Sequence, residues 1–514
     1  MALQIKTIKL ISPTSTGNQA TTGVGFQPKA VMFFATYQTA EGTAANAQMA
    51  VGAAVSSSSR AAIAVQGLDN VSTTDSDRRS SNTKCITLID NAETTLIEAD
   101  FVSMDSDGFT LNFTTVQASN YNIYALCLGG SSLTNTALKE FAANTGTGSQ
   151  AITGVGFQPD AMLMFSVGDP NLNSNTTAVN YFGIGLDSSN TVSVNARMNN
   201  IDADTHTGDV SYKTDKIITS TTGAVAASWE ASLTSMDSDG FTLNWTTAAS
   251  SARRFWALCL RGGNYKLATI TQPSSTGNQA TTGVGFKPSG LFALSAELTA
   301  TGVSAVSNIA IGAGTSSSNR FSVWNGVTDG VSPNRINMNN NSNKIITLLS
   351  AGSTATVNAD ADLVSLDTDG FTLNWTTADG TARKVPVLAL GPAAVPPVIN
   401  SALTASGTAG SSFSYQITAT NSPTSYNATG LPSGLSVNTG TGVISGTPTS
   451  AGVSNITISA TNADGTGSDT LVLTINSSAV ATDFSHVGGM VNMSRGYWKR
   501  VKRGDFDGWI WEED

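Results

Sequence analysis

Hydrophobic and polar residues alternate with a period of two over much of the chain, which is the pattern of strands that bury one face. Residues 227–233 alternate Ala, Trp, Ala and Leu with polar or small residues, and residues 241–245 alternate Phe, Leu and Trp. Asp239 and Gly240 lie between the two runs. Asp-Gly in this place is a strong hairpin signal, because glycine accepts positive φ and aspartate hydrogen-bonds its own turn. The pattern predicts an all-β protein and no helix.

Three ordered signatures recur along the first 391 residues with a period of about 130 residues. GNQATTGVGFQP at 17–28 returns as GSQAITGVGFQP at 148–159 and GNQATTGVGFKP at 277–288. DSDGFTLNF returns twice as D(S/T)DGFTLNW, and ALCLGG returns as ALCLRGG and VLALG. A period of this length is too long for a solenoid unit. The repeats therefore predict three homologous β-sandwich domains at 1–131, 132–263 and 264–391, each expected to fold by itself.

One strand of each repeat is a nearly continuous apolar run that follows the Gly-Val-Gly-Phe-x-Pro segment. The runs are AVMFFAT from Ala30, AMLMFSV from Ala161 and GLFALSA from Gly290. Such a run is typical of a strand in the middle of a two-layer sandwich.

The replicated acidic residues lie in the Asp-x-Asp-Gly turns. The turn motif comprises Asp105, Asp107 and Gly108, then Asp237, Asp239 and Gly240, then Asp367, Asp369 and Gly370. We interpret it as structural. Calcium binding is an alternative, although two carboxylates supply few of the six to eight oxygens that calcium takes. A glycosidic acid and base pair is another, although such carboxylates must flank a substrate cleft.

Composition narrows the function further. Charged residues are 12% and hydrophobic residues 40% of the chain, and the net charge is −10. This balance argues against a helical protein and against whole-chain affinity for nucleic acid. The chain has 2 His, at 206 and 486, so a His-dependent triad or a multi-His metal site is hard to build. We expect no enzyme, no catalytic residue, no metal and no cofactor.

The cysteines and several aromatic residues are interpreted as packing positions. Cys127 and Cys259 occupy the same place in two repeats, and Cys85 aligns with isoleucines, so free buried thiols are expected. Tyr121 with Tyr124, or Phe255 with Trp256, would suit carbohydrate binding. Tyr124, Trp256 and Pro386 are nevertheless aligned positions, which favours core or interdomain packing. A receptor site is expected on the loops that differ most between repeats, at 37–49, 168–181 and 297–308.

The composition changes at GPAAVPPVIN from Gly391, a Pro-rich connector, and residues 392–477 read as short alternating strands with Gly, Pro and Asn turns. The runs GLPSGL, ISGTP and ATN resemble the Putative Ig domain family. The resemblance implies an Ig-like β-sandwich without the cysteine pair of antibody domains. It also implies a spacer or adhesive module of the kind found in bacterial surface proteins and bacteriophage virion proteins.

The three repeats resemble the tandem β-domains of phage structural and tail-fibre proteins, through the GFxP and DGFTLNW signatures. Together the resemblances imply a non-enzymatic structural protein on the outside of a phage particle, as a fibre, appendage or capsid decoration, with a capacity for host-surface or glycan adhesion. A decoration with a purely stabilising role and a bacterial glycan-binding surface adhesin are the alternatives. The N-terminus does not read as a signal peptide, and we expect synthesis in the host cytoplasm and localisation in the virion. Three tandem copies also suggest an intrachain pseudo-trimer, with a homo-oligomer as the alternative.

The last segment, 478–514, concentrates aromatic and basic residues in a chain that is otherwise poor in charge. Docking onto other virion subunits is expected, because Trp and Arg supply much of the energy of interfaces. Packing on the chain's own Ig-like domain and weak nucleic-acid binding are the alternatives. The candidate docking residues are Arg495, Tyr497, Trp498, Lys499, Arg500, Lys502, Arg503, Trp509 and Trp511.

Overall fold

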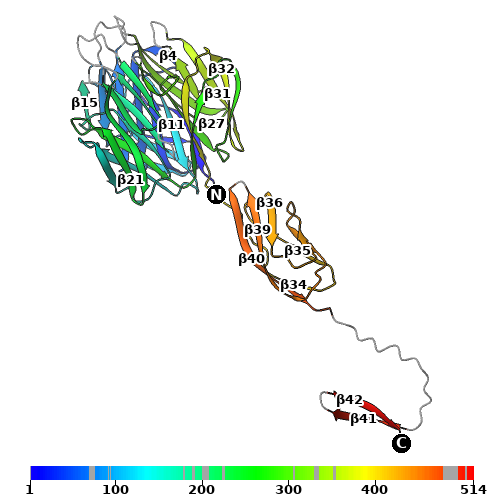
Figure 1. Cartoon of the computed structure of the whole chain (residues 1–514). Helices are drawn as coiled ribbons and strands as arrows, with labels where there is room; N and C mark the ends of the chain where they lie inside the picture. The colour runs from blue at the N-terminus through cyan, green and yellow to red at the C-terminus, as the bar shows by residue number, and fades with distance from the viewer. Residues whose placement is uncertain are drawn as a thin grey trace. The chain divides into compact units, whose positions relative to one another are not determined.

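The computed structural model describes residues 2–68, 76–90, 92, 94–177, 180–187, 192–198, 208–222, 226–304, 307–328, 335–350, 355–462, 464–478, 496–503 and 506–513. His206, His486 and Arg495 lie outside these ranges. Every regular element within them is a strand, which confirms the predicted all-β class (Figure 1). The chain divides into two compact units, Met1–Val395 and Pro396–Asp514.

The repeats supply equivalent strands in the same order, and all of these strands pair antiparallel. Repeat 1 contains β1 (Gln4–Ile11), β2 (Gly17–Thr22), β3 (Pro28–Ala35), β4 (Gly42–Ala45), β5 (Ala47–Ala54), β6 (Arg60–Gly67), β7 (Ser76–Ser81), β8 (Ile86–Ile89), β9 (Thr95–Asp105), β10 (Gly108–Thr115) and β11 (Asn122–Gly129). Repeat 2 contains β12 (Asn135–Ala142), β13 (Gly148–Thr153), β14 (Ala161–Ser166), β15 (Ser174–Thr177), β16 (Asn180–Asp187), β17 (Val192–Met198), β18 (Gly208–Lys213), β19 (Ile218–Thr222), β20 (Ala226–Asp237), β21 (Gly240–Thr247) and β22 (Arg254–Arg261). Repeat 3 contains β23 (Asn264–Thr271), β24 (Gly277–Thr282), β25 (Gly290–Ser295), β26 (Gly302–Ser304), β27 (Ser307–Ser316), β28 (Asn319–Thr328), β29 (Arg335–Asn341), β30 (Ile346–Leu349), β31 (Val357–Asp367), β32 (Gly370–Ala378) and β33 (Lys384–Gly391).

Each repeat forms a sandwich of a four-stranded and a seven-stranded sheet. In repeat 1 the smaller sheet has the order β2-β10-β9-β8. The hairpin β9-β10 turns at the predicted Asp-Gly, with Asp105 opposite Gly108, and the equivalent hairpins β20-β21 and β31-β32 do the same. Phe33 from the larger sheet meets Phe109 from the smaller one edge to face, with ring centroids 5.5 Å apart. The alternating apolar residues of each hairpin thus cover one side of a sandwich core.

A glycine in β5, β16 and β27 lets the two sheets approach closely at equivalent points. A Cβ on Gly52 would collide with the carbonyl oxygen of Cys85, and the same holds for Gly185 against Ile217 and for Gly312 against Ile345. The collision is with backbone, so side-chain rearrangement cannot relieve it. This position excludes any larger residue in all three repeats.

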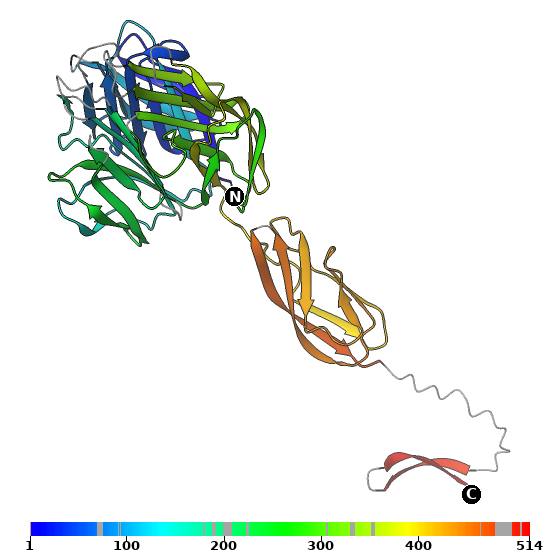
Figure 2. The ribbon, with the colours of Figure 1, turned by 45° about the horizontal axis from the view of Figure 1, so that its top comes forward.

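The seven-stranded sheets are completed by exchange of strands between repeats (Figures 1 and 2). β15 of repeat 2 pairs with β7 of repeat 1, and β26 of repeat 3 pairs with β18 of repeat 2. β4 of repeat 1 pairs with β29 of repeat 3. The exchange therefore runs in one direction and closes into a ring within one chain. Each donated strand covers a sheet edge that would otherwise expose unpaired N–H and C=O groups.

The seven-stranded sheets also share a core. Alternate residues of β3 illustrate this, because Val31 and Phe33 enter the core of sandwich 1 whereas Met32 and Phe34 enter a second core. That second core contains residues of all three repeats, and Phe34 lies 5.3 Å from Phe321 of repeat 3, ring centroid to centroid. Burial on both faces explains why β3, β14 and β25 are continuous apolar runs.

The expected domain limits at 131, 263 and 391 fall at the ends of repeats, between β11 and β12, between β22 and β23, and at the end of β33. The repeats are nevertheless not separate bodies, since residues Met1–Val395 form one compact unit. Shared strands and a shared core account for this.

The second unit contains a smaller sandwich and a hairpin. The sandwich strands are β34 (Thr404–Thr408), β35 (Phe413–Gln416), β36 (Ser425–Thr429), β37 (Leu435–Val437), β38 (Val443–Gly446), β39 (Gly452–Asn462) and β40 (Gly465–Asn476). They form the sheets β34-β40-β39-β36 and β35-β38-β37, and β34 pairs parallel to β40. Buried aliphatic residues such as Ile417, Ile444, Ile458 and Leu473 fill the space between them. β41 (Gly496–Arg503) and β42 (Phe506–Glu513) form the hairpin.

Candidate functional site

The C-terminal hairpin carries the predicted docking residues other than Arg495, which lies outside the described residues. Trp498 pairs with Trp511, and Arg500 pairs with Trp509. Residues directly opposite in an antiparallel pair share a face, so these four positions lie together on one face of the hairpin. Trp509 is 63% exposed and Trp511 is 36% exposed.

The remaining docking positions follow from the same register. Tyr497 lies opposite Glu512, Lys502 opposite Asp507 and Arg503 opposite Phe506. Lys499 Nζ forms an ion pair with Glu512 Oε2 at 3.2 Å. Strand β41 thus carries most of the hairpin's cations and β42 carries most of its acids.

The first aspartate of each turn motif is fixed by two hydroxyl groups. Ser103 and Thr110 donate to Asp105 at 2.7 Å each. The equivalent serine and threonine donate to Asp237 at 2.6 Å each and to Asp367 at 2.7 Å each. These hydrogen bonds hold the pKa of Asp237 and of Asp367 below the ordinary value.

The second aspartate joins two signatures that are far apart in the sequence. Gly23 N and Gly25 N donate to the two carboxylate oxygens of Asp107 at 3.0 and 2.6 Å, and Val24 N donates to its backbone carbonyl. Asp239 receives the same bonds from Gly154 and Gly156 at 2.9 and 2.6 Å. Asp369 receives them from Gly283 and Gly285 at 3.0 and 2.6 Å. The GVG loop and the DxDG turn are therefore one structural clamp in each repeat.

Gly108 completes the clamp in repeat 1. Its φ is +151°, and an added Cβ would collide with the carbonyl oxygen of Thr21. Gly240 and Gly370 have the same conformation and the same close approach. Both carboxylates of each motif already accept hydrogen bonds, from flanking Ser and Thr hydroxyls or from the GVG loop, so a calcium ion or a sugar would have to compete with these donors. The structural interpretation of the motif stays a prediction, and these hydrogen bonds favour it.

Acid should weaken the three clamps together. The backbone N–H groups of the GVG loops hold the pKa of Asp107, Asp239 and Asp369 below the ordinary value. A carboxylate with a lowered folded pKa stabilises the fold above its unfolded pKa, about 4, and loses this contribution as pH falls through the folded value. We expect the melting temperature of the first unit to decrease when the pH is lowered past about 4. The triple variant Asp107→Asn, Asp239→Asn, Asp369→Asn should melt lower at pH 7 and decline less in acid. Calorimetry from pH 7 to pH 2 checks this, and an acid decline as steep as in the unmodified protein contradicts it.

The three cysteines are free and buried, as predicted. Burial raises the pKa of Cys127 and of Cys259 to about 12 and raises that of Cys85 as well. These thiols stay protonated at neutral pH and are poor nucleophiles or metal ligands. Among the described residues no three His, Cys, Asp or Glu side chains come together as a metal-binding group.

The predicted packing role of Tyr124 and Trp256 agrees with the structure. Each is 1% exposed. Tyr124 stacks on Phe321 of repeat 3 at 5.1 Å between ring centroids, and its hydroxyl donates to Asn340 Oδ1 at 2.9 Å. Tyr121 is also buried, and it stacks on Tyr37. The variable segments 37–49, 168–181 and 297–308 contain the donated strands β4, β15 and β26. Much of what varies between repeats therefore joins one repeat to the next.

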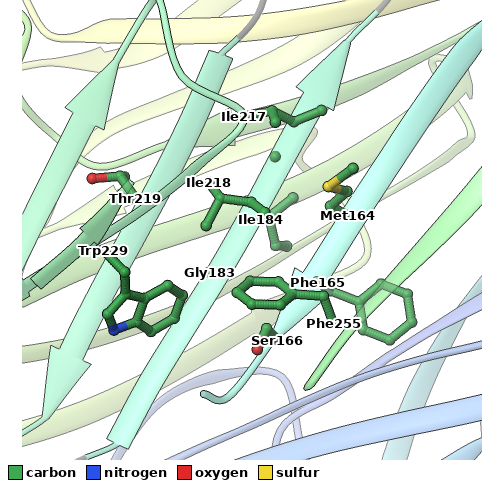
Figure 3. A pocket seen from close by; sticks show the side chains of 11 residues that line it. Met164, Phe165, Ser166, Gly183, Ile184, Ile217, Ile218, Thr219, Trp229 and Phe255 are labelled. Carbon is green, nitrogen blue, oxygen red and sulfur yellow. The ribbon is translucent and has the colours of Figure 1, made fainter. Parts of the chain in front are cut away.

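The apolar cavity in sandwich 2 is a packing irregularity (Figure 3). It holds about 20 Å³ and lies between the two sheets, where Met164, Ile217, Trp229 and Phe255 line it. This is about the room for one water molecule. Large aromatic residues enter the three sandwich cores from different strands: Phe33 on β3, Trp229 on β20 and Trp324 on β28.

Trp324 requires a hydrogen-bond acceptor inside sandwich 3, and Glu297 supplies it. Trp324 Nε1 donates to Glu297 Oε1 at 2.6 Å, and Leu349 N donates to the same oxygen at 3.2 Å. Arg383 Nε lies 3.6 Å from Glu297 Oε2, and Asp379 binds the other side of the guanidinium. Burial raises the pKa of Glu297 to about 7. Because its side chain is only 5% exposed, this carboxyl serves packing and is closed to a substrate.

Two polar pockets at the seams between repeats were not predicted from the sequence. One lies between repeats 1 and 2 and includes Arg60, Asn82 and Glu140, and the other lies between repeats 3 and 1 and includes Arg320 and Lys9. Sequence reasoning missed them because each pocket needs two repeats. A signal was present, since Arg60 and Arg320 follow equivalent serine-rich turns.

The comparisons with known proteins concern the smaller sandwich. Residues 396–476 match the family described as Putative Ig domain. This segment is an Ig-like domain. The Ig-like domain lacks cysteine, as expected, and it indicates a protein of the surface or adhesion type. A comparison of the chain with curated proteins found no match. In the part of the chain that the structure describes, no helix is long and apolar enough to cross a membrane.

Proposed function

We propose that the chain is a non-enzymatic structural protein displayed on the outside of a phage particle, as a fibre, appendage or decoration, with a capacity for host-surface or glycan adhesion. The observation that carries the proposal is the ring of exchanged strands. It builds a threefold arrangement within one chain, with each sheet completed by its neighbour.

The ring suits a protein that must persist outside a cell. No repeat can leave the ring without breaking a strand ladder and exposing part of the shared core. The Ig-like domain that follows the Pro-rich connector fits the same use, because such a module adds reach between a displayed unit and its attachment.

The C-terminal hairpin supplies the attachment in this proposal. An isolated two-stranded hairpin is marginally stable in water, so an exposed Trp509 and Trp511 beside Arg500 favour a covering partner. Trp and Arg are the residue types that most often dominate interface energy. The proposed partner is another protein subunit of the particle.

Immunogold electron microscopy of intact particles tests the proposal. Antibodies raised against the three-repeat unit should label the outside of particles at a fixed place, and label over the capsid would identify a decoration. Particles purified from a mutant phage that lacks the gene provide the control. Absence of label on particles, together with label on the bacterial surface, would reject the proposal in favour of a surface adhesin.

A further inference from the structure

The two seam pockets are equivalent sites. Seam pocket 1 takes Ser58, Arg60 and Asn82 from repeat 1 and Glu140 and Trp256 from repeat 2, with a volume of about 230 Å³. Seam pocket 2 takes Ser318, Arg320 and Ser342 from repeat 3 and Lys9 and Tyr124 from repeat 1, with a volume of about 210 Å³. Glu140 pairs with Trp256 and Lys9 pairs with Tyr124 in the same register, so these wall positions are equivalent, with an acid in seam pocket 1 where seam pocket 2 has a base.

The arginine of each pocket is held in place with donors to spare. Arg60 donates through Nε to the carbonyl of Thr83 and through a terminal nitrogen to Asp100 at 3.4 Å. Arg320 donates in the same way to Asn343 at 2.7 Å and to Asp362 at 3.3 Å. A guanidinium carries five N–H donors, and these bonds use two of them. The pockets thus present fixed donors and do not have to order a free side chain on binding.

Ion pairs hold the charged side chains around the pockets. Asp100 pairs with Arg60 at 3.4 Å and with Lys84 at 3.1 Å, and Arg254 pairs with Glu140 at 3.1 Å. In seam pocket 2, Asp362 pairs with Arg320 at 3.3 Å and with Lys344 at 3.2 Å, and Glu41 pairs with Lys9 at 2.7 Å. An anionic ligand would face Glu140 in seam pocket 1. The equivalent position in seam pocket 2 is Lys9, so a ligand that suits both pockets has uncharged groups that donate and accept: these match the arginine and serine hydroxyls of either pocket, and Glu140 or Lys9 as well.

We infer that the two seam pockets each bind one uncharged sugar residue. Hydroxyl groups are donors and acceptors together, so one sugar ring can bind the arginine and the serine hydroxyls of either pocket at once. Pockets for drug-sized ligands hold roughly 300–1,000 Å³, so these smaller pockets fit a single ring. The role of such binding in host adhesion rests on the proposed display outside a particle.

Among the described residues, the third seam, between repeats 2 and 3, does not repeat this arrangement. Gly185 pairs with Ser193, whereas Gly52 pairs with Ala62 and Gly312 with Ser322, so repeat 2 has two residues fewer between these paired positions. On the opposite wall, Thr269 and Pro386 take the places of the charged and aromatic residues. The inference is therefore two sites per chain, with the third seam as a built-in control.

Titration of the full chain with methyl glycosides of glucose, galactose, mannose and N-acetylglucosamine tests this inference, with glucuronate and phosphate as anionic probes. Saturation-transfer NMR and calorimetry should find at least one neutral glycoside that binds with a stoichiometry of two. Ser58→Phe should fill seam pocket 1 and Ser318→Phe should fill seam pocket 2. Each single change should lower the stoichiometry to one, and the double change should abolish binding.

Ser57→Phe and Ser317→Phe are the matched controls. Ser57 and Ser317 precede the pocket serines in the sequence, are exposed, and do not line either seam pocket. Melting curves verify that all variants fold. Binding of anions alone, binding that survives the double change, or no binding to any neutral glycoside would each overturn the inference. Sugar binding is measured on the isolated protein, so it can fail while particles label with antibody, or succeed while they do not.

Discussion

Replacing Asn340 with leucine is expected to destabilise the three-repeat unit by about 3–5 kcal/mol, because several buried polar groups at the seam between repeats 3 and 1 lose their hydrogen-bond partner. Asn340 Nδ2 donates to Thr36 Oγ1 at 2.9 Å and to Gln38 Oε1 at 2.8 Å. Its Oδ1 accepts from Tyr124 at 2.9 Å and from Asn122 at 3.2 Å. Leucine has a similar size and satisfies none of these partners. Urea unfolding of the full chain, followed by tryptophan fluorescence, measures the change.

Ser80 provides the matched control, since it pairs with the first residue of donated strand β15 as Asn340 pairs with the first residue of β4. Ser80 donates one hydrogen bond, to Asn171 O at 2.8 Å. Ser80→Ala should therefore cost only about 1 kcal/mol. Tyr124→Phe removes one partner of Asn340 and should give an intermediate loss even where the leucine variant fails to fold. Equal losses of unfolding free energy in the three variants would contradict a central role of Asn340 in this hydrogen-bond network.

Removing residues 495–514 should abolish incorporation of the chain into particles and leave both the three-repeat unit and the Ig-like domain folded. The hairpin carries the exposed Trp509 and Trp511, and interface tryptophans often contribute about 2 kcal/mol or more each. Loss of two such anchors would weaken docking by roughly a thousandfold. Immunoblots of gradient-purified particles, compared with the total lysate, measure incorporation.

Two point variants separate docking from an effect on the fold. The double change Trp509→Ala, Trp511→Ala should reproduce the truncation, whereas Val453→Ala should incorporate normally, because Val453 is an exposed apolar residue of the Ig-like domain and not of the hairpin. Normal incorporation of the truncated chain would refute docking through the hairpin. A lower melting temperature of the Ig-like domain after truncation would instead support packing of the tail on that domain.

The sequence allowed the strands and hairpins to be predicted because their signals are local. The alternating residues around Asp239 and Gly240 lie on one hairpin, and the run from Ala30 is a buried strand. The clamp between Asp107 and Gly23 could not be predicted in the same way. Its partners are 84 residues apart. Both signatures recur in every repeat, but recurrence alone does not indicate that the two are in contact.

The exchange of strands could not be predicted from the sequence for a different reason. Donated strands β4, β15 and β26 are short, and their residues, GTAA, SNTT and GVS, are small, polar or β-branched without a periodic pattern. Their strand conformation comes from the receiving sheet. Seam pocket 1 takes residues from two repeats, so the sequence positions of Arg60 and Glu140 do not indicate that both line one pocket.

The ring also sets the order in which the protein can be completed during synthesis. Asn340 and Thr36, which meet at the closing seam, are 304 residues apart along the chain. At roughly 5–20 residues per second, the ribosome needs tens of seconds to travel that distance. Strand β4 remains unpaired during this interval, because its partner β29 belongs to the last repeat to be translated. The nascent chain therefore carries an open edge until repeat 3 emerges, and a chaperone that shields β4 would raise the yield of closed rings.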